Sequence, residues 1–159
     1  QVPQESYLFP GTVADNIAYG ASGATDDEVQ AAVERIGALG VIGTIPGGFN
    51  ARVGERGRGL SSGQRQIIAL ARAEMLTPAV LLLDEATATL DPATERAVLD
   101  ASDKAMAGRT SVVVAHRLAT AARADRILVI DEGRIIEDGC HEDLISAGGR
   151  YAHMWAVNR

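Results

Sequence analysis

Apolar positions recur at helical spacing through the first half of the chain. Thr25 and Glu28 stand in the arrangement of a capping box, which marks the start of a helix. Apolar residues then follow at three- or four-residue steps, at Val29, Val33, Ile36 and Leu39. The spacing predicts an amphipathic helix that ends at Gly40. A shorter helix is expected from Thr12 to Ile17.

A second long helix is predicted in LSSGQRQIIALARAEML. Ser61 and Gln64 form another candidate capping box. The core face is supplied by Ile67, Ile68, Ala71 and Met75. The preceding residues 43–59 are rich in glycine and arginine and contain Pro46, so we expect an irregular segment. Residues 10–76 contain no strand comparable to those that follow, which indicates a separate helical lobe.

Two nearly unbroken apolar runs, AVLLLD at 79–84 and TSVVVA at 110–115, predict strands. Between them, Asp91 and Pro92 suit the N-cap and first position of a helix that Gly108 ends. Strands joined by a helix at this spacing indicate a crossover, and therefore a parallel sheet in an α/β fold. Because neither run alternates with polar residues, the sheet is expected to be covered on both faces.

The last third of the chain predicts a hairpin between helices. After a short helix at 117–123, the segments RILVI and RIIED flank a DEGR turn. They are expected to pair as a hairpin that adds an antiparallel edge to the sheet. Two short helices are expected at 141–147 and 150–157.

Composition narrows the class of protein. The chain has 159 residues, 47% of them hydrophobic and 23% charged, as in an ordinary globular domain. A net charge of −6 argues against a nucleic-acid surface, and no apolar run approaches the length of a membrane span. The single cysteine, Cys140, fits a reducing compartment. It adjoins His141, but no second pair stands at ligand spacing, so no metal site is predicted there.

Polar side chains follow both apolar strands. In open parallel sheets, ligands bind beyond the carboxyl ends of the strands, which is where Asp84 and Glu85 fall. One acid there could hold Mg²⁺ and the next could polarise an attacking water; alternatively, they only cap the following loop. His116 should emerge at the same edge, where it could donate to a phosphate oxygen or be an ordinary packed or exposed histidine.

The LSSGQ stretch adds a third element. Free N–H groups at a helix start and the helix dipole favour anions. An ordinary N-cap is the alternative.

Five motifs, in this order, resemble the nucleotide-binding domain of ATP-binding cassette (ABC) transporters over nearly the whole chain. Gln4 in VPQES matches the Q-loop glutamine, and LSSGQ is similar to the family signature. VLLLDE is similar to the Walker B strand, ATLD, ending at Asp91, to the D-loop, and His116 in AHRLAT matches the switch histidine. VGERG, residues 53–57, is similar to a segment that precedes the signature in exporters.

The resemblance implies a site for Mg²⁺ and ATP. Asp84, together with Gln4, would hold Mg²⁺, and Glu85 would be the general base or position the water. His116 and Gln4 would contact the γ-phosphate, the metal or the attacking water. The implied nucleotide-binding residues are Ser61, Ser62, Gly63, Gln64 and Asp91. Of these, Ser61, Gly63 and Gln64 would touch ATP held by a partner domain.

The resemblance also implies partners. Two nucleotide-binding domains would sandwich two nucleotides head to tail, which makes association part of catalysis. Glu55 and the helical lobe would face the transmembrane domains at the cytoplasmic face of the plasma or inner membrane. Export is favoured by VGERG and by YLFPGTVADNI. No nucleic-acid partner is expected.

Three departures from the family qualify these roles. Ser62 replaces a second glycine of the signature, and Ala88 and Thr89 stand where Ser-Ala is common. The third departure is larger. The only lysine, Lys104, follows no glycine-rich loop, so the chain has no GxxxxGK[ST] phosphate loop (Walker A). In the family that loop precedes the Q-loop, at which this chain begins.

The chain is therefore expected to be the C-terminal portion of a longer domain. Alone, it should neither bind ATP tightly nor hydrolyse it, and it should expose strand edges and apolar surface. The implied fold is an incomplete P-loop NTPase (RecA-like) core with an inserted helical subdomain and a C-terminal hairpin and helices. The expected parts are the Q-loop segment at 1–9, the helical subdomain at 10–76 and the core at 77–159.

Two other functions stay open. One is a soluble ABC ATPase that does not drive transport. The other is a non-catalytic module that completes the ATP site of a partner. Glu85 and His116 argue against the second, because a purely structural partner needs neither residue.

Overall fold

The chain folds into two compact units, which are described separately. The computed structural model describes residues 7–84 and 90–158. The first unit is Gln1–Val112 and the second is Val113–Arg159. Within the described ranges, no helix is both long enough and apolar enough to cross a lipid bilayer.

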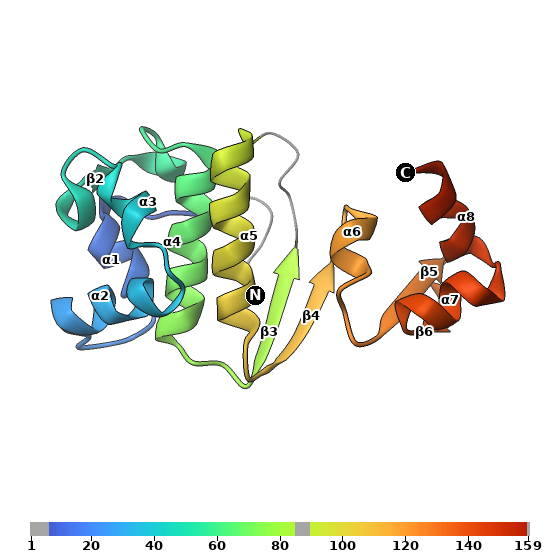
Figure 1. Ribbon diagram of the computed structural model, residues 1–159. Helices are drawn as coiled ribbons and strands as arrows, with labels where there is room; N and C mark the ends of the chain where they lie inside the picture. Colours follow the sequence, from blue (N-terminus) through green and yellow to red (C-terminus); the bar gives the residue numbers. More distant parts are fainter. Residues whose placement is uncertain (1–6, 85–89, 159) are drawn as a thin grey trace. The chain divides into compact units, whose positions relative to one another are not determined.

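The first unit is built around α4, Ser62–Met75. Among the described residues, α4 is contacted by the helices α1 (Val13–Ile17), α2 (Asp26–Arg35), α3 (Leu39–Gly43) and α5 (Pro92–Met106). Figure 1 shows α5 lying alongside α4. Three of the four residues predicted for the apolar face of α4, Ile67, Ile68 and Ala71, have no exposed surface, whereas Met75 is only partly buried. Much of the core of this unit therefore packs against α4, the helix that begins in LSSGQ.

Side-chain caps set the starts of these helices. Capping boxes form at Thr12, Thr25 and Ser61, which confirms the two predicted from sequence and adds the first. The helix predicted to run to Gly40 instead ends at Arg35. Gly37 adopts a left-handed backbone with φ of 70°, which stops the helix, and α3 follows after it.

The segment between α3 and α4 holds only short elements. β2 (Arg52–Val53) pairs antiparallel with β1 (Gly11–Thr12), and the 3₁₀ turns η1 (Gly48–Asn50) and η2 (Glu55–Gly57) flank β2. This agrees with the irregular segment predicted there.

Strands β3 (Val80–Asp84) and β4 (Thr110–Val114) form one two-stranded sheet, with α5 between them in sequence. Their arrows point the same way in Figure 1, as the predicted crossover requires. On β3, Leu81 and Leu83 are buried at 0% and 8% exposure.

The alternate residues of these strands are open. Val80 and Leu82 are 53% and 43% exposed, and Val112 and Val114 are 52% and 57% exposed. The unbroken apolar runs predicted a sheet that is buried on both faces. Among residues 7–84 and 90–158, the sheet of β3 and β4 is not buried on both faces. Exposed apolar surface, which was also expected, is present.

The second unit contains the predicted hairpin and closing helices. β5 (Ile127–Asp131) and β6 (Arg134–Gly139) pair antiparallel as a two-stranded sheet of their own, so the hairpin's predicted place at the edge of the larger sheet stays a prediction. The turn between them uses positive φ at Glu132 and Gly133, 45° and 73°. The helices are α6 (Leu118–Ala121), α7 (His141–Ala147) and α8 (Arg150–Val157).

One face of the hairpin forms the core of the second unit. Ile127 and Val129 pack there with Leu144 and Tyr151. An aromatic group extends this core, since Nδ1 of His141 lies 2.8 Å from the Tyr151 hydroxyl. The His141 ring also meets the Trp155 ring edge-on, with centroids 4.7 Å apart.

Candidate functional site

The start of α4 is held by reciprocal hydrogen bonds. The N–H of Gln64 donates to Oγ of Ser61 at 3.1 Å, and the N–H of Ser61 donates to Oε1 of Gln64 at 2.9 Å. Nε2 of Gln64 also donates to Oγ1 of Thr44 at 3.2 Å, which ties this turn to the end of α3. The Gln64 side chain is thus engaged at both ends in fixing the helix start.

This cap uses only part of the donor capacity of the first turn. An α-helix leaves the N–H groups of its first turn without intrahelical acceptors. The capping box satisfies the N–H of Gln64, so those of Ser62 and Gly63 can serve an acceptor from outside the helix. Together with the helix dipole, these groups suit an anion.

Gly63 lets two helix starts come together. A Cβ atom built on Gly63 would overlap Cγ2 of Thr94, in the first turn of α5. It would also lie 3.6 Å from Cδ2 of Leu90. The absence of a side chain at Gly63 therefore allows close packing of the signature-like turn against the residues that follow the ATLD stretch.

Asp91 acts as the N-cap of α5, as predicted. Its Oδ1 accepts from the N–H groups of Ala93 and Thr94, at 3.1 and 3.0 Å. Hydrogen bonds from the Thr94 side chain and N–H hold the pKa of the Asp91 carboxyl below its usual value. The carboxylate is thus committed to the helix start, and its predicted contact with nucleotide stays a prediction.

Of the four predicted metal-binding and catalytic residues, the structure describes Asp84 and His116. Asp84 is partly buried at the end of β3, as expected for a residue that follows an apolar strand. His116 is exposed between β4 and α6, and it belongs to the second unit. Gln4 and Glu85 lie outside the described residues.

The described part of the proposed Mg²⁺ site fits the ion in chemistry. Asp84 offers carboxylate oxygens, which are the ligands that Mg²⁺ prefers. Its location at the carboxyl end of a parallel strand is where ligands of open sheets bind.

Arg72, which the sequence analysis missed, anchors α4 to the segment after the Q-loop-like residues. Its Nε and Nη2 donate to the backbone oxygen and Oδ1 of Asn16, at 2.8 and 3.2 Å, and its Nη1 donates to the oxygen of Tyr7 at 3.2 Å. The guanidinium also lies over the rings of Phe9 and Tyr19, 5.7 and 5.4 Å from their centroids. A cation inside the apolar run IIALARA was the available signal.

Comparison with known proteins identifies the group to which the chain belongs. Residues 1–88, more than half of the chain, match the family described as "ABC transporter". The chain belongs to the ABC transporter family. The resemblance carried by the five motifs is therefore confirmed.

Individual relatives agree with the ABC assignment. The chain is 49% identical over 157 residues to a "Multidrug efflux ATP-binding/permease protein" of Mycobacterium bovis. The aligned residues cover 99% of this chain and 13% of that protein. It is 49% identical over 158 residues to "ATP-binding cassette sub-family B member 6" of Homo sapiens, covering 99% of this chain and 19% of that protein. It therefore spans less than a fifth of the length of these curated relatives.

A solved ABC structure shares the fold. A bacterial Atm1-family ABC exporter with ATP bound superposes with a TM-score of 0.86 at 46% identity, over 98% of this chain and 27% of that one. The chain is thus a portion of an ABC nucleotide-binding domain, and its α/β P-loop NTPase class is confirmed.

Proposed function

We propose that this chain is the part of an ABC exporter's ATPase domain that runs from the Q-loop to the C-terminal helices. The observation that carries the proposal is the packing at Gly63, which sets the signature turn of α4 against the start of α5. Membership of the ABC family and the similarity to exporters support it. The full-length protein would hydrolyse ATP to power transport across a membrane.

Separate residues would carry separate steps of hydrolysis. Asp84 and Gln4 would hold Mg²⁺, which when bound neutralises charge on the transferring phosphoryl group. Glu85 would accept the proton of the attacking water, and His116, with Gln4, would contact the γ-phosphate or that water.

A second nucleotide-binding domain would complete the site. The N–H groups of Ser62 and Gly63, with the Ser61 hydroxyl, would bind the phosphates of ATP held by the partner in a head-to-tail dimer. Gln64 and Asp91 would contribute mainly by fixing the two helix starts. Glu55 and the helical lobe would face the transmembrane domains at the cytoplasmic face of the membrane.

The chain alone would neither bind ATP tightly nor hydrolyse it. No phosphate loop with its lysine stands among the 159 residues, and that loop supplies the N–H groups that cradle the β- and γ-phosphates. Calorimetry with Mg-ATP should therefore show no micromolar binding to the 159-residue chain. Micromolar binding would contradict this part of the proposal.

Substitution of Glu85 tests the catalytic assignment in the full-length protein. Because a positioned general base contributes about 100- to 10,000-fold, Glu85→Gln should lower kcat for ATP hydrolysis by at least about 100-fold. The matched control is Glu34→Gln, at an exposed position on α2, which should leave kcat unchanged.

An unchanged rate in Glu85→Gln would contradict the role of Glu85 as base. Absence of ATPase activity in the wild-type full-length protein would instead favour the non-catalytic module. ATPase activity in a full-length protein that contains no membrane spans would favour the soluble ABC ATPase.

A further inference from the structure

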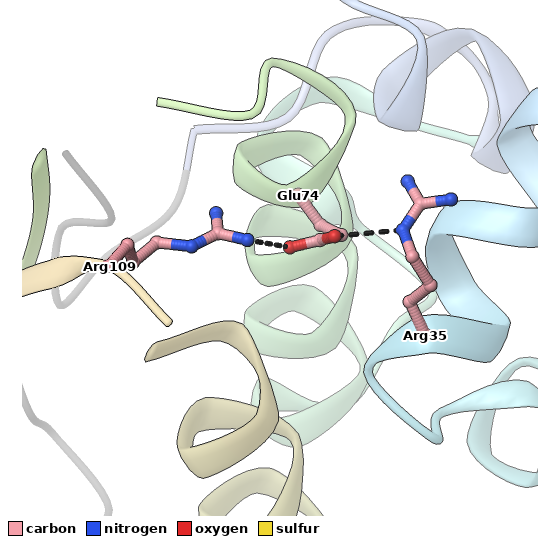
Figure 2. A network of polar contacts seen from close by, with 3 residues as sticks. All are labelled: Arg35, Glu74 and Arg109. Atoms are coloured by element: carbon pink, nitrogen blue, oxygen red, sulfur yellow. Dashed lines mark hydrogen bonds and ion pairs between the residues drawn. The ribbon is translucent and has the colours of Figure 1, made fainter. Parts of the chain in front are cut away.

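A buried carboxylate near the end of α4 joins this helix to α2 and to Arg109, which lies between α5 and β4. Oε1 of Glu74 accepts from Nε of Arg35 at 2.8 Å, and Oε2 of Glu74 accepts from Nη2 of Arg109, also at 2.8 Å. Figure 2 shows the Glu74 carboxylate between the two guanidinium groups, which approach it from opposite sides. Each oxygen has its own arginine, so the side chain works as a two-ended clamp.

The burial of the clamp makes it sensitive to the loss of a partner. The Glu74 side chain is 7% exposed, that of Arg109 17% and that of Arg35 50%. Nη1 of Arg109 is buried and has no hydrogen-bond partner among the described residues. Removing the carboxylate would leave the Arg109 charge in a poorly solvated place, which is costly, whereas replacing both groups by apolar ones need not be.

Two of the three joined segments adjoin predicted site residues in sequence. Arg35 is the last residue of α2 in the helical lobe. Arg109 directly precedes β4, the strand after which His116 follows in sequence. Glu74 itself lies on α4, whose first turn is the signature. A packed helix transmits the position of one end to the other, because its hydrogen-bonded backbone is stiff along the axis.

We propose that Glu74 is a positioning residue for ATP hydrolysis, which holds the signature helix in fixed relation to α2 and to the start of β4. The proposal rests on the proposed function. Glu74 touches no nucleotide; it acts through Arg35 and Arg109. Neutralising it should loosen the register of α4 between its neighbours, and small displacements of positioned groups lower turnover more than they lower ground-state binding.

The first test compares Glu74→Gln with Glu34→Gln in the full-length protein. Glu74→Gln keeps the shape of the side chain but faces one guanidinium with an amide NH₂ group. It should lower kcat for ATP hydrolysis by about 10-fold and change KM for ATP by less than about threefold. Glu34→Gln removes the same charge one residue before Arg35, on an exposed part of α2, and should leave both constants unchanged.

A double variant separates positioning from charge burial. Glu74→Met with Arg109→Met removes both buried charges, so its melting temperature should lie close to that of wild type. Because the oriented bonds are absent, its kcat should stay low. A double variant with wild-type kcat would overturn the proposal, since Glu74 would then only neutralise Arg109.

Arg35→Met keeps the Glu74–Arg109 pair and should fold even if Glu74→Gln does not. It should lower kcat about threefold by releasing α2 alone. The proposal would be overturned if the single variants Arg35→Met and Glu74→Gln both had the kcat of wild type.

Hydrogen exchange distinguishes failure of this inference from failure of the proposed function. In the full-length protein, Glu74→Gln should speed amide exchange in α2 and at the start of β4 relative to Glu34→Gln. Unchanged exchange at both places would overturn the clamp. If the wild-type protein lacks ATPase activity, the proposed function fails, and faster exchange would still establish that Glu74 holds these elements.

Discussion

Helix α4 and strand β3 each contain a run of apolar residues, yet the leucines of these runs are buried to different extents. Leu70 on α4 is 1% exposed, whereas Leu82 on β3 is 43% exposed. The helix is contacted by α1, α2, α3 and α5 within the described chain. The strand is buried on the face of Leu81 and Leu83 and open on the other.

The difference shows that an apolar run in the sequence indicates which residues are suited to burial. It does not indicate whether this part of the chain contains the residues that bury them. A strand with apolar residues at successive positions is suited to a sheet buried on both faces. This chain spans 27% of the Atm1-family exporter chain whose fold it shares. We propose that further residues of the full-length protein cover Val80, Leu82 and Val112.

Matched leucine truncations should give the largest effect. Leu70→Ala removes a fully buried side chain and should lower the free energy of unfolding of the 159-residue chain by about 2–5 kcal/mol. Leu82→Ala removes a side chain that is already 43% exposed and should cost about 1 kcal/mol or less. Urea unfolding of both variants measures the difference.

The same pair in the full-length protein sharpens the comparison. If the open face is covered there, the cost of Leu82→Ala should rise toward that of Leu70→Ala. A cost that stays at about 1 kcal/mol in both proteins would show that the face remains in solvent.

The second prediction concerns the packing of the two helix starts. Gly63→Ala places a methyl group where Cγ2 of Thr94 lies, so the Thr94 side chain or one of the two helices must shift. Overpacking of this kind should lower the free energy of unfolding by about 1–3 kcal/mol. Thr94→Ser removes Cγ2 and keeps the hydroxyl, so adding it to Gly63→Ala should restore most of the loss. Equal melting temperatures for Gly63→Ala and wild type would show that the helix starts are less closely packed.

The smallest effect is expected in the pH dependence of the α5 cap. Because the folded-state pKa of Asp91 is lowered, its ionised form stabilises the fold above the unfolded pKa, about 3.9, and this contribution is lost as the pH falls through the folded pKa. Asn is also a good N-cap but does not titrate. The melting temperature of wild type should therefore fall more steeply than that of Asp91→Asn from about pH 5 downward. Parallel curves would contradict a role for the Asp91 charge.

Features that depend on neighbours in sequence could be predicted. The caps at Thr25, Ser61 and Asp91 and the strand predicted from the run AVLLLD depend on residues within a few positions of one another. The hairpin follows from the same kind of local signal, a turn with Gly133 between two apolar runs. The ABC motifs were likewise recognisable because each is a short contiguous stretch.

Features that depend on distant partners could not be predicted. Arg72 binds Asn16, 56 positions away, and Glu74 binds Arg35, 39 positions away. Nothing near either residue in sequence indicates its partner. The early end of α2 was missed because a glycine inside a helical pattern is often tolerated, and only the left-handed backbone of Gly37 makes it a stop. The catalytic assignments of Gln4, Glu85 and His116 remain predictions.

The location of Trp155 beside His141 gives the second unit a fluorescence signal of its own. Trp155 is the only tryptophan of the chain, and it lies against the core of the second unit through the rings of His141 and Tyr151. Emission excited at the red edge of the indole band therefore comes from Val113–Arg159 alone. Circular dichroism, in contrast, is dominated by the helices of Gln1–Val112. Following both signals during unfolding would show whether the two units melt together or one after the other.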